Sequence, residues 1–124
     1  MPRSANQKRK VLYVMQFLLR NSDEQHPVTV QQIISDLCSK GIPAERKSVY
    51  DDIEDLRRFG LDIISVRHGN FHGYYVGSRE FELPELKLLV DSVQSSKFIT
   101  HKKTLSLIAK IEGLASVHEA QLLS

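Results

Sequence analysis

Apolar positions in the first sixty residues recur with the 3.6-residue period of amphipathic helices. The first stripe predicts a helix over residues 6–20. A second helix is expected to begin at Thr29, because Thr29 and Gln32 have the spacing of a capping box. It should end near Lys40, because Gly41 suits the left-handed cap that closes many helices.

A third helix is predicted from about residue 44 to residue 59, with Gly60 as its stop. The period then changes to about two, and β-branched and aromatic residues flank a Gly/Asn-rich centre, which predicts a hairpin over 62–77. That centre is long for a two-residue turn, so we expect an open tip. Two helices on either side of a short Gly-containing turn, followed by a hairpin, are typical of a winged helix-turn-helix.

The chain becomes helical again from Glu82, with two further apolar stripes and a short amphipathic segment after them. The stripes comprise Leu86, Leu89, Val90 and Val93, then Leu107, Ile108, Ile111 and Leu114. With no second core evident in the sequence, we expect these helices to pack on the first three or on another copy of the chain. The predicted fold is mainly α with a small β-hairpin. It comprises a winged helix-turn-helix at 1–78 and a helical linker or dimerisation segment at 79–124.

Composition and charge narrow the class of protein. The 124 residues are 41% hydrophobic and 26% charged, which is ordinary for a globular domain. The net charge is +2, and the first ten residues carry four positive charges and no negative one. This basic arm suits an anionic partner, although a solvated tail explains it equally well. No segment approaches the roughly 20 apolar residues of a membrane span, and no signal-peptide pattern occurs, so we expect a cytoplasmic protein with no membrane partner.

The third helix carries the strongest candidate site. A helix-turn-helix motif has two helices, and here its second one is the third helix of the chain. The first turns of that helix enter the major groove, where short-range donors reach base edges. Arg46 and Lys47 can donate to guanine or phosphate, and Ser48 and Tyr50 offer hydroxyls. Asp51 can accept from a cytosine amino group or orient basic side chains. The alternative is a solvated helix face with mixed charges.

Carboxylates weaken this interpretation, because the stretch 51–55 holds four of them and phosphates would be repelled. Asp52 and Asp55 are the candidates to pair with Arg57 and Arg58 of the same helix. We therefore expect ion pairs to neutralise part of the run.

Three further groups are candidate DNA contacts. The start of the second helix suits a phosphate, the hairpin suits the minor groove or backbone, and the basic arm suits phosphates. The alternatives are that the residues at the start of the second helix only cap it, that the hairpin is a flexible solvated loop, and that the basic arm is solvated. The residues are Thr29, Gln31 and Gln32; Arg67, His68, Asn70 and His72; and Lys8, Arg9 and Lys10.

Catalytic and metal-binding patterns are weak. His68 and His72 are four residues apart, but the glycines beside them argue against the helical zinc-binding geometry. Ser48 lacks a neighbouring histidine as base. Cys38, the single cysteine, falls on the inward face of the second helix and is expected to be a small core residue. We expect no enzyme activity, no metal site and no cofactor.

Several stretches resemble the N-terminal region of bacterial WYL-domain transcriptional regulators, whose winged helix is of the deoxyribonucleoside-repressor type. The resembling stretches are KRKVLYVMQFLLR at 8–20, RKSVYDDIEDL at 46–56, FHGYYV at 71–76, REFELPELKLLVD at 79–91 and KFIT at 97–100. Asp51 departs from the pattern, since such recognition helices often carry Arg there.

The resemblance implies a homodimeric DNA-binding regulator. Its helices within 83–123 would assemble the dimer and connect to a C-terminal domain that senses an effector ligand. That domain is missing from this sequence, so the chain is either an excised fragment or a naturally short member. The expected function is sequence-specific binding of double-stranded DNA. The alternatives are a winged helix that binds proteins and, as a lesser option, one that binds RNA.

Overall fold

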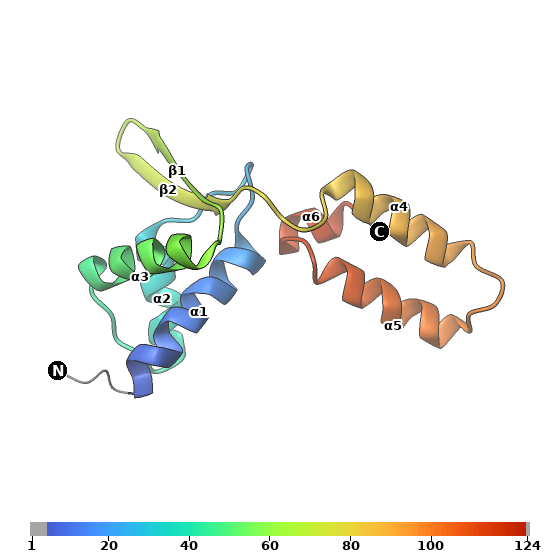
Figure 1. Cartoon of the computed structure of the whole chain (residues 1–124), viewed down its shortest axis with the longest axis horizontal. Coiled ribbons are helices and arrows are strands. Elements are labelled where there is room, and N and C mark those ends of the chain that lie inside the picture. Colours follow the sequence, from blue (N-terminus) through green and yellow to red (C-terminus); the bar gives the residue numbers. More distant parts are fainter. Residues whose placement is uncertain (1–4, 124) are drawn as a thin grey trace. The chain divides into compact units, whose positions relative to one another are not determined.

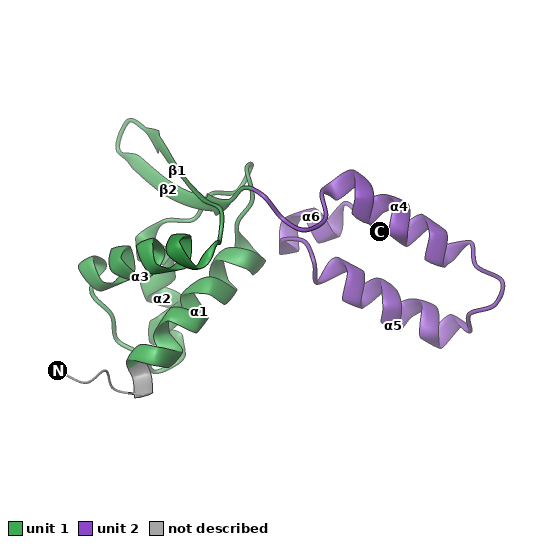
Figure 2. Ribbon diagram, in the orientation of Figure 1, with its two compact units in different colours: residues 1–77 green, residues 78–124 purple. Residues whose placement is uncertain are grey.

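A computed structural model describes residues 5–123, and the fold is mainly helical with one antiparallel two-stranded hairpin (Figure 1). The chain divides into two compact units, residues 1–77 and 78–124 (Figure 2). This division falls one residue from the predicted boundary. Each unit has its own hydrophobic core.

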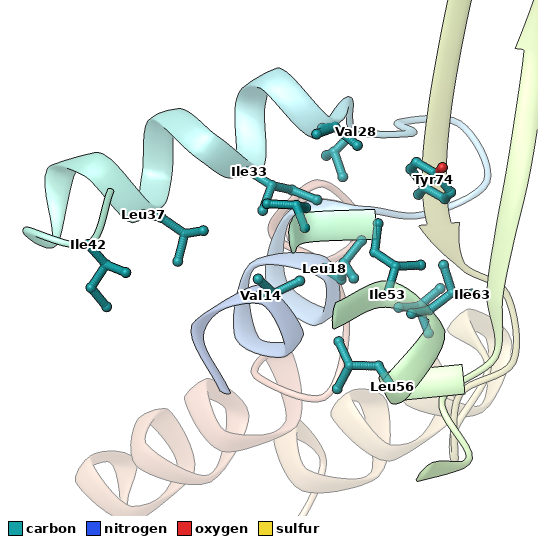
Figure 3. Packing of buried hydrophobic residues seen from close by; sticks show 13 residues of the cluster. Val14, Leu18, Val28, Ile33, Leu37, Ile42, Ile53, Leu56, Ile63 and Tyr74 are labelled. Atoms are coloured by element: carbon teal, nitrogen blue, oxygen red, sulfur yellow. The ribbon is translucent and has the colours of Figure 1, made fainter. Parts of the chain in front are cut away.

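The first unit consists of three helices and the hairpin. The elements are α1 (Ala5–Asn21), α2 (Val30–Ser39), α3 (Arg46–Phe59), β1 (Ile63–His68) and β2 (Phe71–Val76). The three helices pack against one another in pairs, and the hairpin contacts α1 and α3. Apolar side chains from all five elements fill the space between them (Figure 3).

The ends of α2 and α3 follow local rules. Both hydrogen bonds of the predicted capping box between Thr29 and Gln32 are present at the start of α2. Gly41 follows the end of α2 with a φ of 77°, a conformation that favours glycine. α3 begins two residues later than expected, because Glu45 has the extended backbone of an N-cap, and Gly60 closes α3 with a φ of 125°.

The hairpin turn is tighter than the sequence predicts. The strand register pairs Arg67 with His72 and His68 with Phe71, which leaves only Gly69 and Asn70 in the turn. Gly69 has a φ of 58° and Asn70 does not have a positive φ, the pattern of a type II′ turn. The expected open tip is therefore wrong. Strand pairing continues up to a glycine that accepts the turn conformation.

A third backbone segment joins the free edge of β2. Val28 and Tyr74 exchange two backbone hydrogen bonds of 2.8 and 2.7 Å. The buried hydroxyl of Ser22 accepts from the Val76 N–H at 3.0 Å and donates to the Leu18 carbonyl at 2.6 Å. These bonds tie the hairpin to the end of α1 and to the segment before α2.

The second unit contains α4 (Leu83–Gln94), α5 (His101–Glu112) and α6 (Val117–Gln121). The Thr100 side chain caps the start of α5. The expectation that this segment lacks a core is wrong, because the predicted stripes of α4 and α5 pack against each other. The buried residues are Leu86, Val90, Ile111, Ala115 and Leu123.

Part of both stripes nevertheless faces outward. Leu89, Leu107 and Leu114 are 37%, 38% and 44% exposed.

In residues 5–123, no helix combines the length and apolar character needed to cross a membrane.

Candidate nucleic-acid interface

The first two turns of α3 present charged side chains to solvent. Val49 and Ile53 are buried in the core and fix the helix on one side. Arg46, Lys47 and Asp51 are exposed. Two basic groups and one carboxylate therefore stand on the outer surface of a helix whose position is set by core packing.

Asp52 lies on the opposite, buried side of α3. Its carboxylate forms an ion pair with Lys10 of α1, and the two side chains are 7% and 3% exposed. The Lys10 ammonium also donates to the Ser48 carbonyl at 3.3 Å. The structure thus corrects two predictions: Lys10 is buried rather than offered to a phosphate, and Asp52 pairs with Lys10 rather than with Arg57.

The other carboxylates of the run are paired on the surface. The predicted bridge between Asp55 and Arg58 is confirmed, with a distance of 2.8 Å. Arg57 pairs instead with Glu54, which is one turn earlier on the helix. Of the four carboxylates between 51 and 55, Asp51 is the one without an ion-pair partner among the residues described here.

Tyr50 connects α3 to the hairpin. Its half-buried ring stacks on His72, with centroids 6.5 Å apart and an interplanar angle of 21°. The ring also meets Tyr74 edge-on at 6.4 Å, and His72 lies 4.8 Å from Tyr74. Tyr50 therefore packs within the first unit. Ser48 is also half-buried, and its hydroxyl donates to the Glu45 carbonyl at 3.1 Å.

Two arginines surround this contact. Arg67 is directly opposite His72 in the strand register, and Arg46 lies one turn before Tyr50 on α3. Burial lowers the pKa of His72 from its ordinary value, and the charges of Arg67 and Arg46 lower it further. We name Arg46, Tyr50, Arg67 and His72 the basic seam, because they join α3 to the hairpin and hold positive charge together.

Arg57 reinforces the same junction farther along α3. Its Nε donates to the Ile63 carbonyl at 3.0 Å, and its Nη2 donates to the Ser65 hydroxyl at 3.0 Å. Its guanidinium also lies 6.0 Å from the Tyr74 ring centroid. Burial raises the pKa of Tyr74, as do Tyr50 and Glu54, while Arg57 opposes the shift.

The remaining candidate residues lie apart from the seam or are otherwise engaged. The side chains of Thr29 and Gln32 form the α2 capping box, while Gln31 beside them is exposed. His68 and Asn70 are exposed at the end of the hairpin.

Lys8 and Arg9 are exposed on the first turns of α1, where the helix also carries the buried Lys10. The structure therefore keeps two of the three basic residues predicted for the arm on the surface.

Cys38 is exposed, so its expected place in the core is wrong. Ile33 and Leu37 form the inward face of α2, and Cys38 lies about 100° around the helix from Leu37. Within residues 5–123, no three His, Cys, Asp or Glu side chains gather where they could hold a metal ion.

The Lys10–Asp52 pair left a signal in the sequence that the prediction missed. Lys10 precedes the buried Val14 by four residues, and Asp52 follows the buried Val49 by three. Both charged residues thus occupy inward positions of apolar stripes. Opposite charges at such positions on two neighbouring helices indicate a buried pair.

The basic seam was harder to foresee. The sequence places His72 in the hairpin but does not reveal its approach to Tyr50, because that contact depends on the exact strand register. Comparisons of the chain with protein-family models, with curated proteins and with solved structures found no match. The resemblance to WYL regulators therefore stays a prediction, and the geometry of α3 and the hairpin is the basis for a functional proposal.

Proposed function

We propose that the first unit is a winged helix-turn-helix that binds double-stranded DNA, and that the chain acts as a sequence-specific transcriptional regulator. α3 is the recognition helix in the major groove, and β1 and β2 form the wing. Arg46 and Lys47 contact guanine edges or phosphates, because their side chains are exposed on the first turn of α3.

The observation that carries the proposal is the distribution of charge on α3. Asp52 is withdrawn into the pair with Lys10, while Glu54 and Asp55 are neutralised by arginines of the same helix. Among the described residues, Asp51 is therefore the carboxylate of the 51–55 run that no ion pair neutralises. It lies one turn after Lys47. This pairing removes most of the repulsion that the sequence suggested between this run and DNA phosphates.

Other exposed groups extend the proposed interface. Arg67, His68 and Asn70 of the hairpin are available to the backbone or minor groove, and Gln31 lies at the start of α2. Ser48 and Tyr50 remain secondary candidates, since both are half-buried. Lys8 and Arg9 are the candidate phosphate contacts that remain of the basic arm.

The second unit is proposed to mediate homodimerisation, as the resemblance to WYL regulators implies. Exposed apolar side chains on α4 and α5, such as Leu88 at 67% and Leu105 at 56%, are available for such a contact. A dimer would present two recognition helices to a palindromic site. The resemblance also implies an effector ligand and a bacterial cytoplasm, and both belong to the proposal.

The test is selection of duplexes from a random-sequence pool, followed by binding titrations at two salt concentrations. We expect one enriched motif and an affinity that falls steeply with salt. Arg46→Ala/Lys47→Ala should lose about 1–3 kcal/mol for each base contact removed, with unchanged circular dichroism. The matched control Lys102→Ala/Lys103→Ala removes two exposed positive charges from α5 and should keep the selected specificity.

Sequence-blind binding that is equal in wild type and Arg46→Ala/Lys47→Ala would contradict the proposal. That result would favour a winged helix that binds proteins. Stronger binding to single-stranded RNA than to duplex DNA in competition would favour the RNA alternative.

A further inference from the structure

We propose that the basic seam binds a phosphodiester group of duplex DNA and that His72 contacts this group as the imidazolium, so that DNA binding takes up a proton. The inference rests on the proposed function for the identity of the anion. It adds a ligand contact at His72 and a dependence of affinity on pH.

Packing between α3 and the hairpin places His72 at the junction of the two proposed DNA-contacting elements. The ring of His72 lies against Tyr50 of α3 and Tyr74 of β2, with centroids at 6.5 and 4.8 Å, and the two tyrosine rings also meet each other at 6.4 Å. His72 itself remains partly exposed. An anion that lies along the seam therefore meets an imidazole whose position is set by two aromatic neighbours.

The two charges that act most on His72 are both positive. Arg67 faces it across the hairpin, and cross-strand pairs of like charge are unfavourable. Arg46 lies one helical turn before the stacked Tyr50. A phosphodiester between these groups would give each guanidinium an opposite charge and would replace repulsion by charge-assisted hydrogen bonds.

The direction of proton linkage follows from these neighbours. The groups that face His72 are Arg46 and Tyr50 from α3, Arg67 from β1 and Tyr74 from β2. In the free protein, burial and the two arginines lower the pKa of His72. A bound phosphate opposes the arginine charges and raises that pKa, so the complex holds a proton that the free protein lacks near neutral pH.

The primary experiment measures the affinity of the full chain for a mixed-sequence DNA duplex by fluorescence anisotropy between about pH 5.5 and about pH 8. Wild type should bind more tightly as pH falls, by at most about tenfold per pH unit for one proton. The gain should level off below the pKa of His72 in the free protein. His72→Gln should lose most of this slope.

Two other histidine variants serve as comparisons. His101→Gln changes an exposed histidine of α5 and should keep both the affinity and the slope. His68→Gln changes a histidine on the face of the hairpin opposite to His72 and should keep the slope whatever happens to its affinity. A slope that is equal in wild type and His72→Gln overturns the inference while leaving DNA binding intact.

A second readout separates this inference from the proposed function. The pKa of His72 is followed by nuclear magnetic resonance in the full chain, with and without inorganic pyrophosphate. A rise with pyrophosphate, together with no duplex binding, would support the anion site and reject the DNA function. A pKa that neither pyrophosphate nor duplex raises would reject the anion site.

Discussion

The ammonium group of Lys10 on α1 forms a buried ion pair with the carboxylate of Asp52 on α3. The same ammonium donates to the Ser48 carbonyl of α3 at 3.3 Å. One lysine therefore ties α1 to the first two turns of the proposed recognition helix. Because both side chains are less than a tenth exposed, water screens the pair little.

Removing one member of this pair should destabilise the first unit strongly. Lys10→Met leaves the Asp52 carboxylate buried without its lysine, and a loss of about 3–5 kcal/mol in the free energy of unfolding is expected. Lys10→Met/Asp52→Leu should recover most of the lost stability, because the double variant leaves no charged group buried without a partner. The double-mutant cycle is completed by wild type and Asp52→Leu. Urea unfolding of the four proteins measures the coupling energy between Lys10 and Asp52.

The bridge between Arg58 and Asp55 is the control for this experiment. It lies on the surface of α3, with side chains 77% and 39% exposed. Arg58→Met should change stability by less than about 1 kcal/mol. If Lys10→Met cost no more than Arg58→Met, the burial of the Lys10–Asp52 pair would be contradicted.

Gly73 should be intolerant of a side chain because Phe71 occupies the space above it. A Cβ at Gly73 would lie 2.8 Å from two atoms of the Phe71 ring and 3.0 Å from the Pro27 Cβ. Gly73→Ala is therefore expected to cost about 1–3 kcal/mol through overpacking. In a Phe71→Ala background Gly73→Ala should cost less, because only the contact with the Pro27 Cβ remains. Strictly additive costs in thermal unfolding would argue against this contact.

Local signals in the sequence predicted most of the first unit. The Thr29–Gln32 capping box and the glycines at 41 and 60 placed the ends of α2 and α3 to within about two residues. These features were predictable because they depend on neighbours within one helical turn. Cys38 was misplaced because it lies beside the apolar stripe of α2 and not within it.

Features that depend on long-range pairing were missed. The hairpin turn could not be located from composition, because the Gly-rich centre allows more than one register and Gly73 turned out to lie within β2. The stacking of His72 on Tyr50 depends on that register. The core of the second unit was missed because the apolar stripe of α4 does not show by itself what covers it. In the structure the stripe of α5 covers it.

Leu86 and Leu88 of α4 provide a test of the proposed dimer. Leu86 is 1% exposed in the core of the second unit, and Leu88 is 67% exposed. Leu86→Ala should destabilise the second unit by about 2–5 kcal/mol. Leu88→Ala should preserve the fold measured by circular dichroism and weaken self-association measured by sedimentation. A wild-type chain that sediments as a monomer at tens of micromolar would reject the dimer.

Protonation of His72 should also affect stability in the absence of DNA. Its folded-state pKa is lowered below the ordinary value of 6.5 by burial, Arg67 and Arg46, so the folded state resists protonation more than the unfolded state does. This contribution to stability is fully present above pH 6.5 and is lost as pH falls through the folded-state pKa. His72→Gln should remove that part of the pH dependence, and Arg67→Gln should reduce it by relieving the cross-strand repulsion. Urea unfolding at a series of pH values measures both effects. Parallel curves for wild type and His72→Gln would mean that neither burial nor the arginine charges lower the pKa of this imidazole on folding.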